Sequence, residues 1–289
     1  MIHLSEIRIY PVKSLRGLSP RSAVVEPWGL QQDRRWMLVD STGRFISQRE
    51  FPALARVDAA AEGGALRIAA EGQGALELRV PDETVPSEPV TVWRSTVAAR
   101  PAGDAAAAWF SRLLGVACRL VYLADPTLRR VSPEYGRAED RVSFADGYPL
   151  LLASLPSLAA LNRRLPTAPL PIDRFRPNLV VDGCAPFEED SWRLIRVGEV
   201  TFRLVKPCDR CIVTTVDQRS GERAIDAARA EPLRTLARFR RSGNKILFGQ
   251  NLIPSSLGEL RIGDPVEVLE RGPPPVFGAE GAGAAVEGT

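Results

Sequence analysis

Residues 57–93 have the sequence VDAAAEGGALRIAAEGQGALELRVPDETVPSEPVTVW, and this stretch decides the fold that we expect. Brief runs that favour β-strands are broken about every eight to twelve residues by Gly, Pro, Asp or Glu. The runs are Val57–Ala61, Ala65–Ala69, Leu76–Val80 and Val90–Trp93. Such regular punctuation suits an antiparallel β-barrel or sandwich better than a fold of βαβ units. The sequence therefore predicts a mainly β architecture.

The residues before this stretch also favour strands. Short strands are expected over residues 2–12 and 22–27, joined by a basic loop of sequence PVKSLRG. A third strand is expected over Arg35–Asp40, and Ser41–Gly43 after it is a turn signal of the hairpin type. The amino-terminal part is thus expected to consist of short strands and turns.

Helices are expected to be few. The first is Asp104–Leu114, with Asp104 as its N-cap and Gly115 as its stop. A second is expected over Leu155–Leu165, with Pro156 in its first turn. The remaining elements are a helix over Pro232–Arg240 and strands over Asn178–Val181, Glu199–Lys206, Ile212–Val216, Asn244–Leu252 and Leu260–Leu269.

The expected fold class is mixed α+β and mainly β, in two parts. An N-terminal β-barrel-like region is predicted over residues 1–123, and a second β-barrel domain with a few flanking helices over residues 124–271. Asp125–Arg141, rich in Pro and Arg, is interpreted as a linker or a mobile loop. The Gly/Ala/Pro-rich tail, residues 272–289, is predicted to be disordered.

Composition excludes several classes of function. The balance of 38 basic and 35 acidic residues gives a net charge of +3, which is too small to indicate nucleic-acid binding. No apolar run is long enough to span a bilayer, and residues 1–10 read as a strand rather than a signal peptide. Four unevenly spaced cysteines do not resemble a disulfide framework, so a reducing cytoplasm is the expected location.

The single histidine, His3, narrows the chemistry further. It excludes any two-histidine zinc or iron site and argues against acid/base chemistry or a catalytic triad based on histidine. The sequence has no GxGxxG motif after a strand and no P-loop, so NAD(P)H or ATP binding by those routes is not expected. No cysteine follows Cys211, which excludes an appended iron–sulfur domain.

Cys208 and Cys211 form a CxxC motif that leaves several readings open. A thioredoxin-type redox pair would place the first cysteine at a helix N-terminus, whereas a β-branched run favouring a strand follows Cys211. A zinc site would need further ligands, and Cys118 and Cys184 are isolated. Two buried structural thiols are the simplest alternative. The fourth reading is a single thiolate that ligates a metal carried by an organic cofactor.

Basic residues at stiff turns give weight to the fourth reading. Pro11 and Pro177 restrict the backbone beside Lys13, Ser14, Arg176 and Asn178. Each basic residue alone is most simply a solvated charge. Converging on one cleft, however, such donors would suit a phosphate and the edge of a heterocycle.

Eight motifs occur in an order that resembles a known family. They are Tyr10–Ser14 (YPVKS), Asp33–Trp36 (DRRW), Phe175–Asn178 (FRPN), Glu189–Trp192 (EDSW), Cys208–Asp217 (CDRCIVTTVD), Glu231–Leu233 (EPL), Leu247–Gln250 (LFGQ) and Gly263–Val266 (GDPV). Together they resemble the MOSC-domain family, named for the carboxy-terminal part of molybdenum cofactor sulfurases. Within it, the chain is most similar to the amidoxime-reducing branch, which carries an amino-terminal β-barrel region. The resemblance covers about residues 2–269.

The resemblance implies a set of cofactor residues. Cys211 corresponds to the protein ligand of molybdenum, with Asp209 and Arg210 at contacts to the molybdopterin. Lys13, Ser14, Arg34, Arg176 and Asn178 match positions that hold the cofactor. Gly147 and Tyr148 align with a Thr-Ser pair of the animal proteins, and Asn251 falls where those carry Tyr, so these three depart from the family pattern.

The resemblance also implies an activity. It is an N-reductive, pyridoxal phosphate-independent oxidoreductase that reduces amidoximes or hydroxylamino compounds to amines, with molybdenum–molybdopterin as cofactor. Electrons would come from a separate ferredoxin-, flavin- or cytochrome-type protein, and neither nucleic acid nor a membrane is an expected partner. Asp217 is a candidate proton donor, although a structural role suits it better. The alternative is a carrier or binding protein for the cofactor or its sulfur, without turnover of its own.

Overall fold

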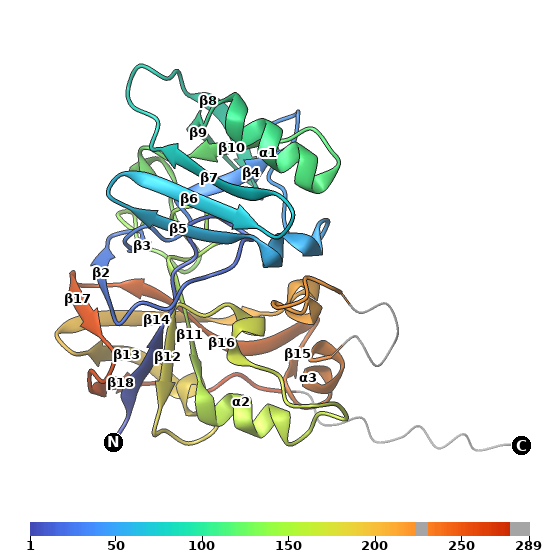
Figure 1. The fold of residues 1–289 in the computed structure, drawn as a ribbon. Coiled ribbons are helices and arrows are strands. Elements are labelled where there is room, and N and C mark those ends of the chain that lie inside the picture. The colour runs from blue at the N-terminus through green and yellow to red at the C-terminus, as the bar shows by residue number, and fades with distance from the viewer. Residues whose placement is uncertain (224–230, 278–289) are drawn as a thin grey trace, which may run out of the picture.

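The computed structural model describes residues 1–223 and 231–277, and Figure 1 shows two stacked parts. The upper part of Figure 1 holds most of the N-terminal strands and α1, and the lower part holds the later strands with α2 and α3. The expected disorder of the tail falls mainly on residues 278–289, which lie outside the described residues. In the described ranges, no helix combines the length and the apolar character needed to cross a bilayer.

The lower part is built on an eight-stranded sheet. Its strand order is β1-β12-β11-β16-β14-β13-β18, with β15 pairing to β16 at the side. Only the β11–β12 pair is parallel, and the other pairs are antiparallel. The strands are β1 (His3–Ile7), β11 (Leu150–Ser154), β12 (Leu179–Asp182), β13 (Trp192–Val197), β14 (Val200–Asp209), β15 (Arg241–Ser242), β16 (Lys245–Pro254) and β18 (Val266–Arg271).

The upper part contains smaller antiparallel sheets. One has the order β4-β10-β9-β8 and another β5-β6-β7. A third sheet, β17-β2-β3, lies at the side of the lower part and contributes Ala23, Val25, Leu30 and Leu260 to the core there. The strands are β2 (Ser22–Glu26), β3 (Gly29–Leu30), β4 (Trp36–Val39), β5 (Asp58–Glu62), β6 (Ala65–Ala70), β7 (Gly74–Arg79), β8 (Glu88–Val92), β9 (Ser95–Pro101), β10 (Arg119–Tyr122) and β17 (Gly258–Arg261). The mixed, mainly β fold class is confirmed.

The two parts exchange strands. β1 pairs with β12 in the large sheet, with His3 opposite Asp182, and β2 pairs with β17 from near the C-terminus. The chain therefore leaves the large sheet after β1, builds the upper part and returns at β11. The boundary near residue 123 stays a prediction, because strands of the first thirty residues belong to sheets that the second part completes.

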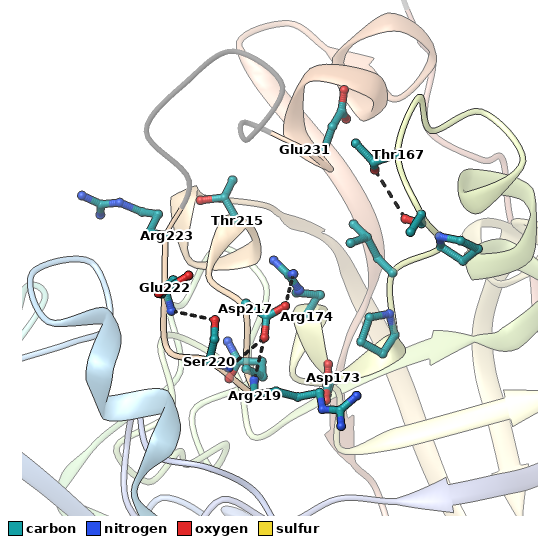
Figure 2. A pocket seen from close by; sticks show the side chains of 15 residues that line it. Thr167, Asp173, Arg174, Thr215, Asp217, Arg219, Ser220, Glu222, Arg223 and Glu231 are labelled. Atoms are coloured by element: carbon teal, nitrogen blue, oxygen red, sulfur yellow. Dashed lines mark hydrogen bonds and ion pairs between the residues drawn. The ribbon is translucent and has the colours of Figure 1, made fainter.

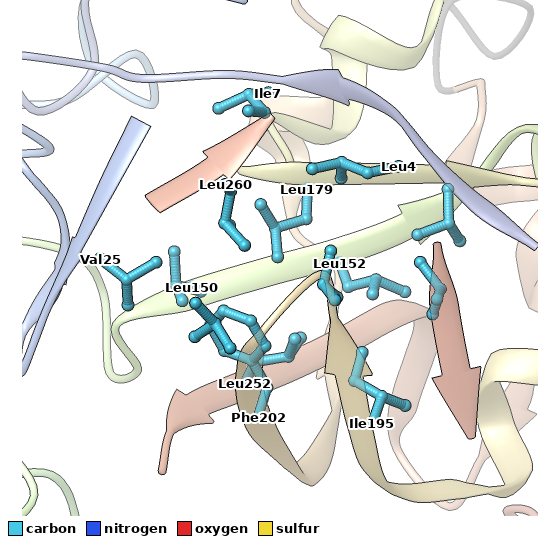
Figure 3. Close-up of a cluster of buried hydrophobic side chains, with 14 of the residues drawn as sticks. Leu4, Ile7, Val25, Leu150, Leu152, Leu179, Ile195, Phe202, Leu252 and Leu260 are labelled. Atoms are coloured by element: carbon cyan, nitrogen blue, oxygen red, sulfur yellow. The ribbon is translucent and has the colours of Figure 1, made fainter. Parts of the chain in front are cut away.

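The two largest apolar clusters form the cores of the two parts. Figure 3 shows the lower cluster, where Leu4, Leu152 and Phe202 from different strands of the large sheet meet. All three are fully buried, and each such side chain contributes about 1.5–3 kcal/mol relative to an exposed one. The upper cluster packs Trp109 and Phe110 of α1 against Trp36 and Leu120. Both parts thus have their own core, and the cleft described below lies where they meet.

The helices are short, and their apolar side chains pack against the sheets. They are α1 (Asp104–Leu114), α2 (Leu155–Asn162) and α3 (Leu233–Phe239), together with 3-10 turns η1 (Pro52–Arg56), η2 (Pro126–Leu128), η3 (Ile172–Phe175), η4 (Glu188–Ser191) and η5 (Ile212–Thr215). Gly115 closes α1 in the left-handed conformation, as expected, but the N-cap is Gly103 and not Asp104, which is the first helical residue. The expected helices are thus present, with α2 ending three residues early.

The strand expected over Ile212–Val216 is wrong. β14 ends at Asp209, and Ile212–Thr215 form the single turn η5 with Cys211 at its N-cap position. The Thr214 hydroxyl donates to the Cys211 carbonyl at 2.9 Å, and the Thr215 hydroxyl to that of Ile212 at 2.7 Å. These local side-chain bonds satisfy the backbone carbonyls and outweigh the strand preference of β-branched residues.

Candidate functional site

A small cleft between the two parts gathers the residues that the sequence nominated. Its free volume is about 140 Å³. Lining it are all the positions that the resemblance assigns to the cofactor: Lys13, Ser14, Arg34, Gly147, Tyr148, Arg176, Asn178, Asp209, Arg210, Cys211 and Asn251. The roles assigned to them stay predictions, but segments far apart in the sequence do converge on one place.

Unusual backbone conformations mark the cleft. Ser14, Arg34 and Arg176 have φ angles of 70°, 48° and 52°, in the left-handed region that residues with a side chain rarely adopt. They are half of the six non-glycine residues with positive φ in the described ranges. Such conformations cost about 1–3 kcal/mol each and tend to cluster at functional sites, where the surrounding structure imposes them.

Close packing of β11 and β16 places Asn251 at the cleft. Gly249 in β16 has φ of +77°, and a Cβ built there would lie 2.6 Å from the Leu152 carbonyl oxygen. Only glycine allows this approach. Two residues later, Asn251 is opposite Leu151 in the register, and its side-chain amide donates to the Lys206 carbonyl at 3.2 Å.

The Tyr10 ring makes cation–π contacts with both Arg34 and Arg176. The guanidinium carbons of Arg34 and Arg176 lie 4.4 and 4.2 Å from the centre of the Tyr10 ring. Burial raises the pKa of Tyr10, whose hydroxyl donates to the Pro177 carbonyl at 3.2 Å. The neutral ring therefore supports two like charges through cation–π contacts.

The side chain of Asn178 hydrogen-bonds to Arg34 and to the backbone, so its polar atoms are already paired within the protein. Its side-chain oxygen accepts from Arg34 Nη1 at 2.8 Å and from the Leu151 amide at 3.2 Å. Its amide nitrogen donates to the Arg8 carbonyl at 3.1 Å. Asp33 Oδ2 also accepts from Arg34 Nη1, at 2.6 Å. Arg34 is thus fixed by a buried network, and Asn178 acts through it.

Arg176 is a half-buried cation that has no ionic partner among the described residues. Burial lowers its pKa to about 10. Its guanidinium donates to a neutral group, the Gln218 side-chain oxygen, at 3.3 Å. Burying a charge without an ionic partner is costly, so this position has the character of a binding site for an anion.

Lys13 enters the cleft from a buried position. Burial lowers the pKa of Lys13 to about 8, while its ion pair with Asp146 acts in the opposite direction. Nζ also donates to the Phe144 carbonyl at 2.9 Å. Burial opposes ionisation of Asp146, but Lys13 and Arg49 outweigh it and hold the pKa of that carboxyl below its usual range.

Both cysteines of the CxxC motif line the cleft, and each has a guanidinium on its sulfur. Arg210 Nη1 donates to Cys208 Sγ at 2.9 Å, and Arg49 Nη2 donates to Cys211 Sγ at 3.1 Å. Burial raises the pKa of Cys208. Cys208 lies at the end of β14 rather than at a helix N-terminus, so the thioredoxin-type geometry is not formed.

Among the described residues, no three His, Cys, Asp or Glu side chains form a metal-binding group, which removes support for a zinc site.

Sequence reasoning missed three residues at the cleft. Arg49 and Asp146 line it, and Trp93 contacts both, with its ring centre 4.6 Å from the Arg49 guanidinium and Nε1 donating to Asp146 at 3.1 Å. No local pattern distinguishes Arg49 from a solvated arginine. A positive φ of 56° at the exposed Trp93 is visible only in the structure.

A larger hollow elsewhere carries a different set of residues. It has a volume of about 800 Å³ and is shown in Figure 2. Asp217 lies there, paired with Arg174 at 2.7 Å and accepting from the Arg219 and Ser220 amides at 2.9 Å. Asp217 therefore has a structural role and is no proton donor for the cleft. None of the residues that the resemblance assigns to the cofactor lines this hollow.

The side chains of the cleft have the chemistry that an anionic metal–pterin cofactor requires. Five cationic side chains line it, Lys13, Arg34, Arg49, Arg176 and Arg210, against the carboxylates of Asp146 and Asp209. Arg210 Nε is buried without a hydrogen-bond partner in the described structure, which also points to a missing acceptor. Cys211 supplies a soft sulfur ligand of the kind that redox-active metals prefer. The positive excess suits an anionic group.

Comparisons with known proteins identify the family of the chain. Residues 1–117 match the model of the MOSC N-terminal beta barrel domain, and residues 139–267 match that of the MOSC domain. Mitochondrial amidoxime-reducing component 1 of Mus musculus is 33% identical over 92% of this chain and 82% of its own length. Mitochondrial amidoxime reducing component 2 of Bos taurus is 35% identical over 91% and 82%. The molybdenum cofactor sulfurase of Oryza sativa subsp. japonica is 35% identical over 86% of this chain but 32% of its own length.

Proposed function

The chain belongs to the MOSC-domain family, and from this premise we propose that it is a molybdenum-cofactor-dependent oxidoreductase acting on N-hydroxylated compounds. The names of its relatives link the family to the molybdenum cofactor and to amidoxime reduction. The observation that carries the proposal is the cleft that Cys211 shares with Lys13, Arg34 and Arg176, of which Lys13 is buried and the two arginines have left-handed backbone conformations.

The residues of the cleft divide into two kinds. Cys211 would hold the metal through sulfur, while Lys13, Arg34 and Arg176 would hold the anionic part of the pterin. When bound, the cofactor supplies the two-electron redox chemistry of the reaction. The protein supplies orientation, because Asn178 and Asp33 fix Arg34 and the Tyr10 ring carries both arginines.

The proposed reaction is balanced for an amidoxime. R–C(NH₂)=NOH, two electrons and two protons give R–C(NH₂)=NH and water. The N–O bond breaks, nitrogen is reduced, and the oxygen leaves as water. Electrons come from a separate donor protein of the ferredoxin, flavin or cytochrome type.

Activity with an artificial reductant tests this proposal. The cofactor-loaded chain is mixed with reduced viologen and benzamidoxime, and benzamidine formation is followed by chromatography. Turnover that is lost in Cys211→Ser supports the reductase. A protein that holds stoichiometric molybdenum and pterin but makes no benzamidine or other amine from a panel of N-hydroxylated compounds contradicts it.

A carrier of the cofactor or its sulfur is the second candidate. The rice sulfurase favours it, because this chain corresponds to about a third of that protein. A carrier would release its cofactor to an acceptor apoprotein and remain inert in the viologen assay. Tight retention of the cofactor together with turnover would exclude this candidate.

A further inference from the structure

The sulfur of Cys211 has a neighbour from the opposite part of the molecule. Arg49 Nη2 donates to Cys211 Sγ at 3.1 Å, across 162 positions of sequence. Arg49 follows β4 and belongs to the upper part, whereas Cys211 lies between β14 and η5 of the lower part. The two parts therefore meet at this sulfur atom.

The loop that carries Arg49 is held by its own side chains. The Ser47 hydroxyl donates to Glu50 Oε2 at 2.6 Å, and the Ser47 amide donates to the same oxygen at 3.1 Å. The Arg49 amide in turn donates to Ser47 Oγ at 3.2 Å. These bonds fix the main chain at Arg49 without any ligand in the cleft.

The guanidinium group is held from two sides. The Trp93 ring centre lies 4.6 Å from Arg49 Cζ, and Asp146 Oδ2 lies 3.8 Å from Arg49 Nη2. Trp93 Nε1 donates to Asp146 Oδ1 at 3.1 Å, so the two supports are themselves joined. With 23% of its side chain exposed, Arg49 is restrained toward the sulfur rather than free in solvent.

The segment after Cys211 docks on the same loop. Arg223 Nη1 donates to the Arg49 carbonyl at 2.7 Å. Gln218 and Gln48 exchange hydrogen bonds at 3.0 and 3.3 Å. The Cys211 turn and the Arg49 loop are therefore connected at three points, and the Arg49–Cys211 contact is part of a built interface.

We propose that Arg49 is a positioning residue for the metal-ligating sulfur, an inference that rests on the proposed function. Its N–H group directs Cys211 Sγ into the cleft. By withdrawing electron density from the sulfur, the same hydrogen bond raises the reduction potential of a metal bound there, because hydrogen bonds to a ligating sulfur favour the reduced metal. The upper part of the molecule thereby tunes a site whose ligand belongs to the lower part.

Three variants of the full cofactor-loaded chain test the proposal. Arg49→Met removes the donor and the charge but keeps an unbranched side chain beside Trp93, and Arg49→Lys keeps the charge with one compact donor. Arg94→Met is the matched control, because it makes the same arginine-to-methionine change at an exposed position next to Trp93 in the sequence. Each is compared with wild type for molybdenum and pterin content, for the electron paramagnetic resonance signal of Mo(V), and for the midpoint potential in a dye-mediated titration.

We expect a graded effect at equal cofactor content. Arg49→Met shifts the midpoint potential to a more negative value and changes the Mo(V) signal, Arg49→Lys shows a smaller shift in the same direction, and Arg94→Met matches wild type. Should Arg49→Met fail to fold, the shift in Arg49→Lys decides. The inference is overturned if cofactor-loaded Arg49→Met has the midpoint potential and Mo(V) signal of wild type. If only Arg49→Lys folds, the same result in that variant overturns it. In either case the proposed function still stands. Wild-type protein that holds no molybdenum overturns both.

Discussion

Gln48 and Gln218, 170 positions apart, exchange two side-chain hydrogen bonds of 3.3 and 3.0 Å and are almost fully buried. Gln48 also donates to the Ser14 carbonyl at 2.7 Å, and Gln218 accepts from Arg176. This amide pair therefore joins two of the nominated cofactor residues across the boundary between the upper and lower parts. The packing at this boundary therefore helps to position Ser14 and Arg176 in the cleft.

The amide pair predicts a measurable coupling. Gln48→Leu and Gln218→Leu should each lower the free energy of unfolding by about 1–3 kcal/mol, because each leaves a buried amide without its partner. The double variant should lose less than the sum, by at least about 0.5 kcal/mol. Urea unfolding of the four proteins checks this, with the exposed Gln31→Leu as control. Strictly additive losses would show that the two side chains are not coupled.

Replacing Arg176 is predicted to stabilise the cofactor-free chain and to weaken cofactor binding. Arg176→Met should raise the unfolding free energy of the cofactor-free chain by about 1 kcal/mol, because it removes a half-buried cation that has no ionic partner in the described part of the chain. The same variant should bind the cofactor more weakly, by about tenfold, because a guanidinium–anion contact is lost. Thermal unfolding with and without cofactor measures both effects. A variant that loses stability in both states would contradict the assignment.

Lys13 predicts a pH dependence of anion binding. Its pKa of about 8 in the cofactor-free protein means that its charge is lost between pH 7 and pH 9. Sulfate, whose own charge is constant in that range, should bind up to about tenfold more weakly at pH 9 than at pH 7. Calorimetric titration of the cofactor-free chain measures this, and Lys13→Arg should bind equally at both values. An equal loss of affinity in Lys13→Arg would assign the effect to another group.

Glu189 predicts a pH dependence of stability away from the cleft. Burial raises the pKa of this carboxyl to about 7, although hydroxyls of Ser157 and Ser154 donate to it. The folded state therefore keeps a proton that the unfolded state releases above its ordinary pKa of 4.5. This contribution to stability is full below about pH 4.5 and is lost as pH rises through about 7.

The variant Glu189→Gln isolates that contribution. Between pH 5 and pH 8, wild type should lose about 2 kcal/mol more of its unfolding free energy than Glu189→Gln. The amide can still accept from the serine hydroxyls, so the variant is expected to fold. Urea unfolding at the two pH values measures the difference. Parallel pH profiles of the two proteins would mean that Glu189 does not titrate in this range.

Much of this architecture could be predicted from local sequence. The strand runs of residues 57–93 are β5 to β8, and Gly115 ends α1, because turn residues and helix stops act over a few positions. The turn η5 could not be predicted, because its hydroxyl-to-carbonyl bonds compete with strand preference only after β14 has ended. Interlocking of the parts through β1 and β2 is likewise a long-range outcome.

The candidate site could also be predicted in part, where its residues belong to recognisable sequence motifs. Residues in ordered motifs, such as Lys13, Arg176 and Cys211, could be nominated because the motifs are specific as a set, and the structure brings them to one cleft. Arg49 and Asp146 could not, because their significance lies in contacts with sulfur and with Lys13 that no sequence pattern encodes. Asn178 was nominated for a direct contact, yet its side-chain groups are used by Arg8, Arg34 and Leu151.

The content of molybdenum and pterin in Cys211→Ser, compared with Cys208→Ser, tests the central claim most directly. The two thiols are three positions apart in the same cleft, so the control is matched in chemistry and surroundings. Proteins are expressed in a host that makes the cofactor, and metal and pterin are measured per chain. We predict near-stoichiometric metal in wild type and Cys208→Ser, with metal lost or its coordination changed in Cys211→Ser. Equal metal and an unchanged metal spectrum in all three, or no pterin in wild type, would contradict the account.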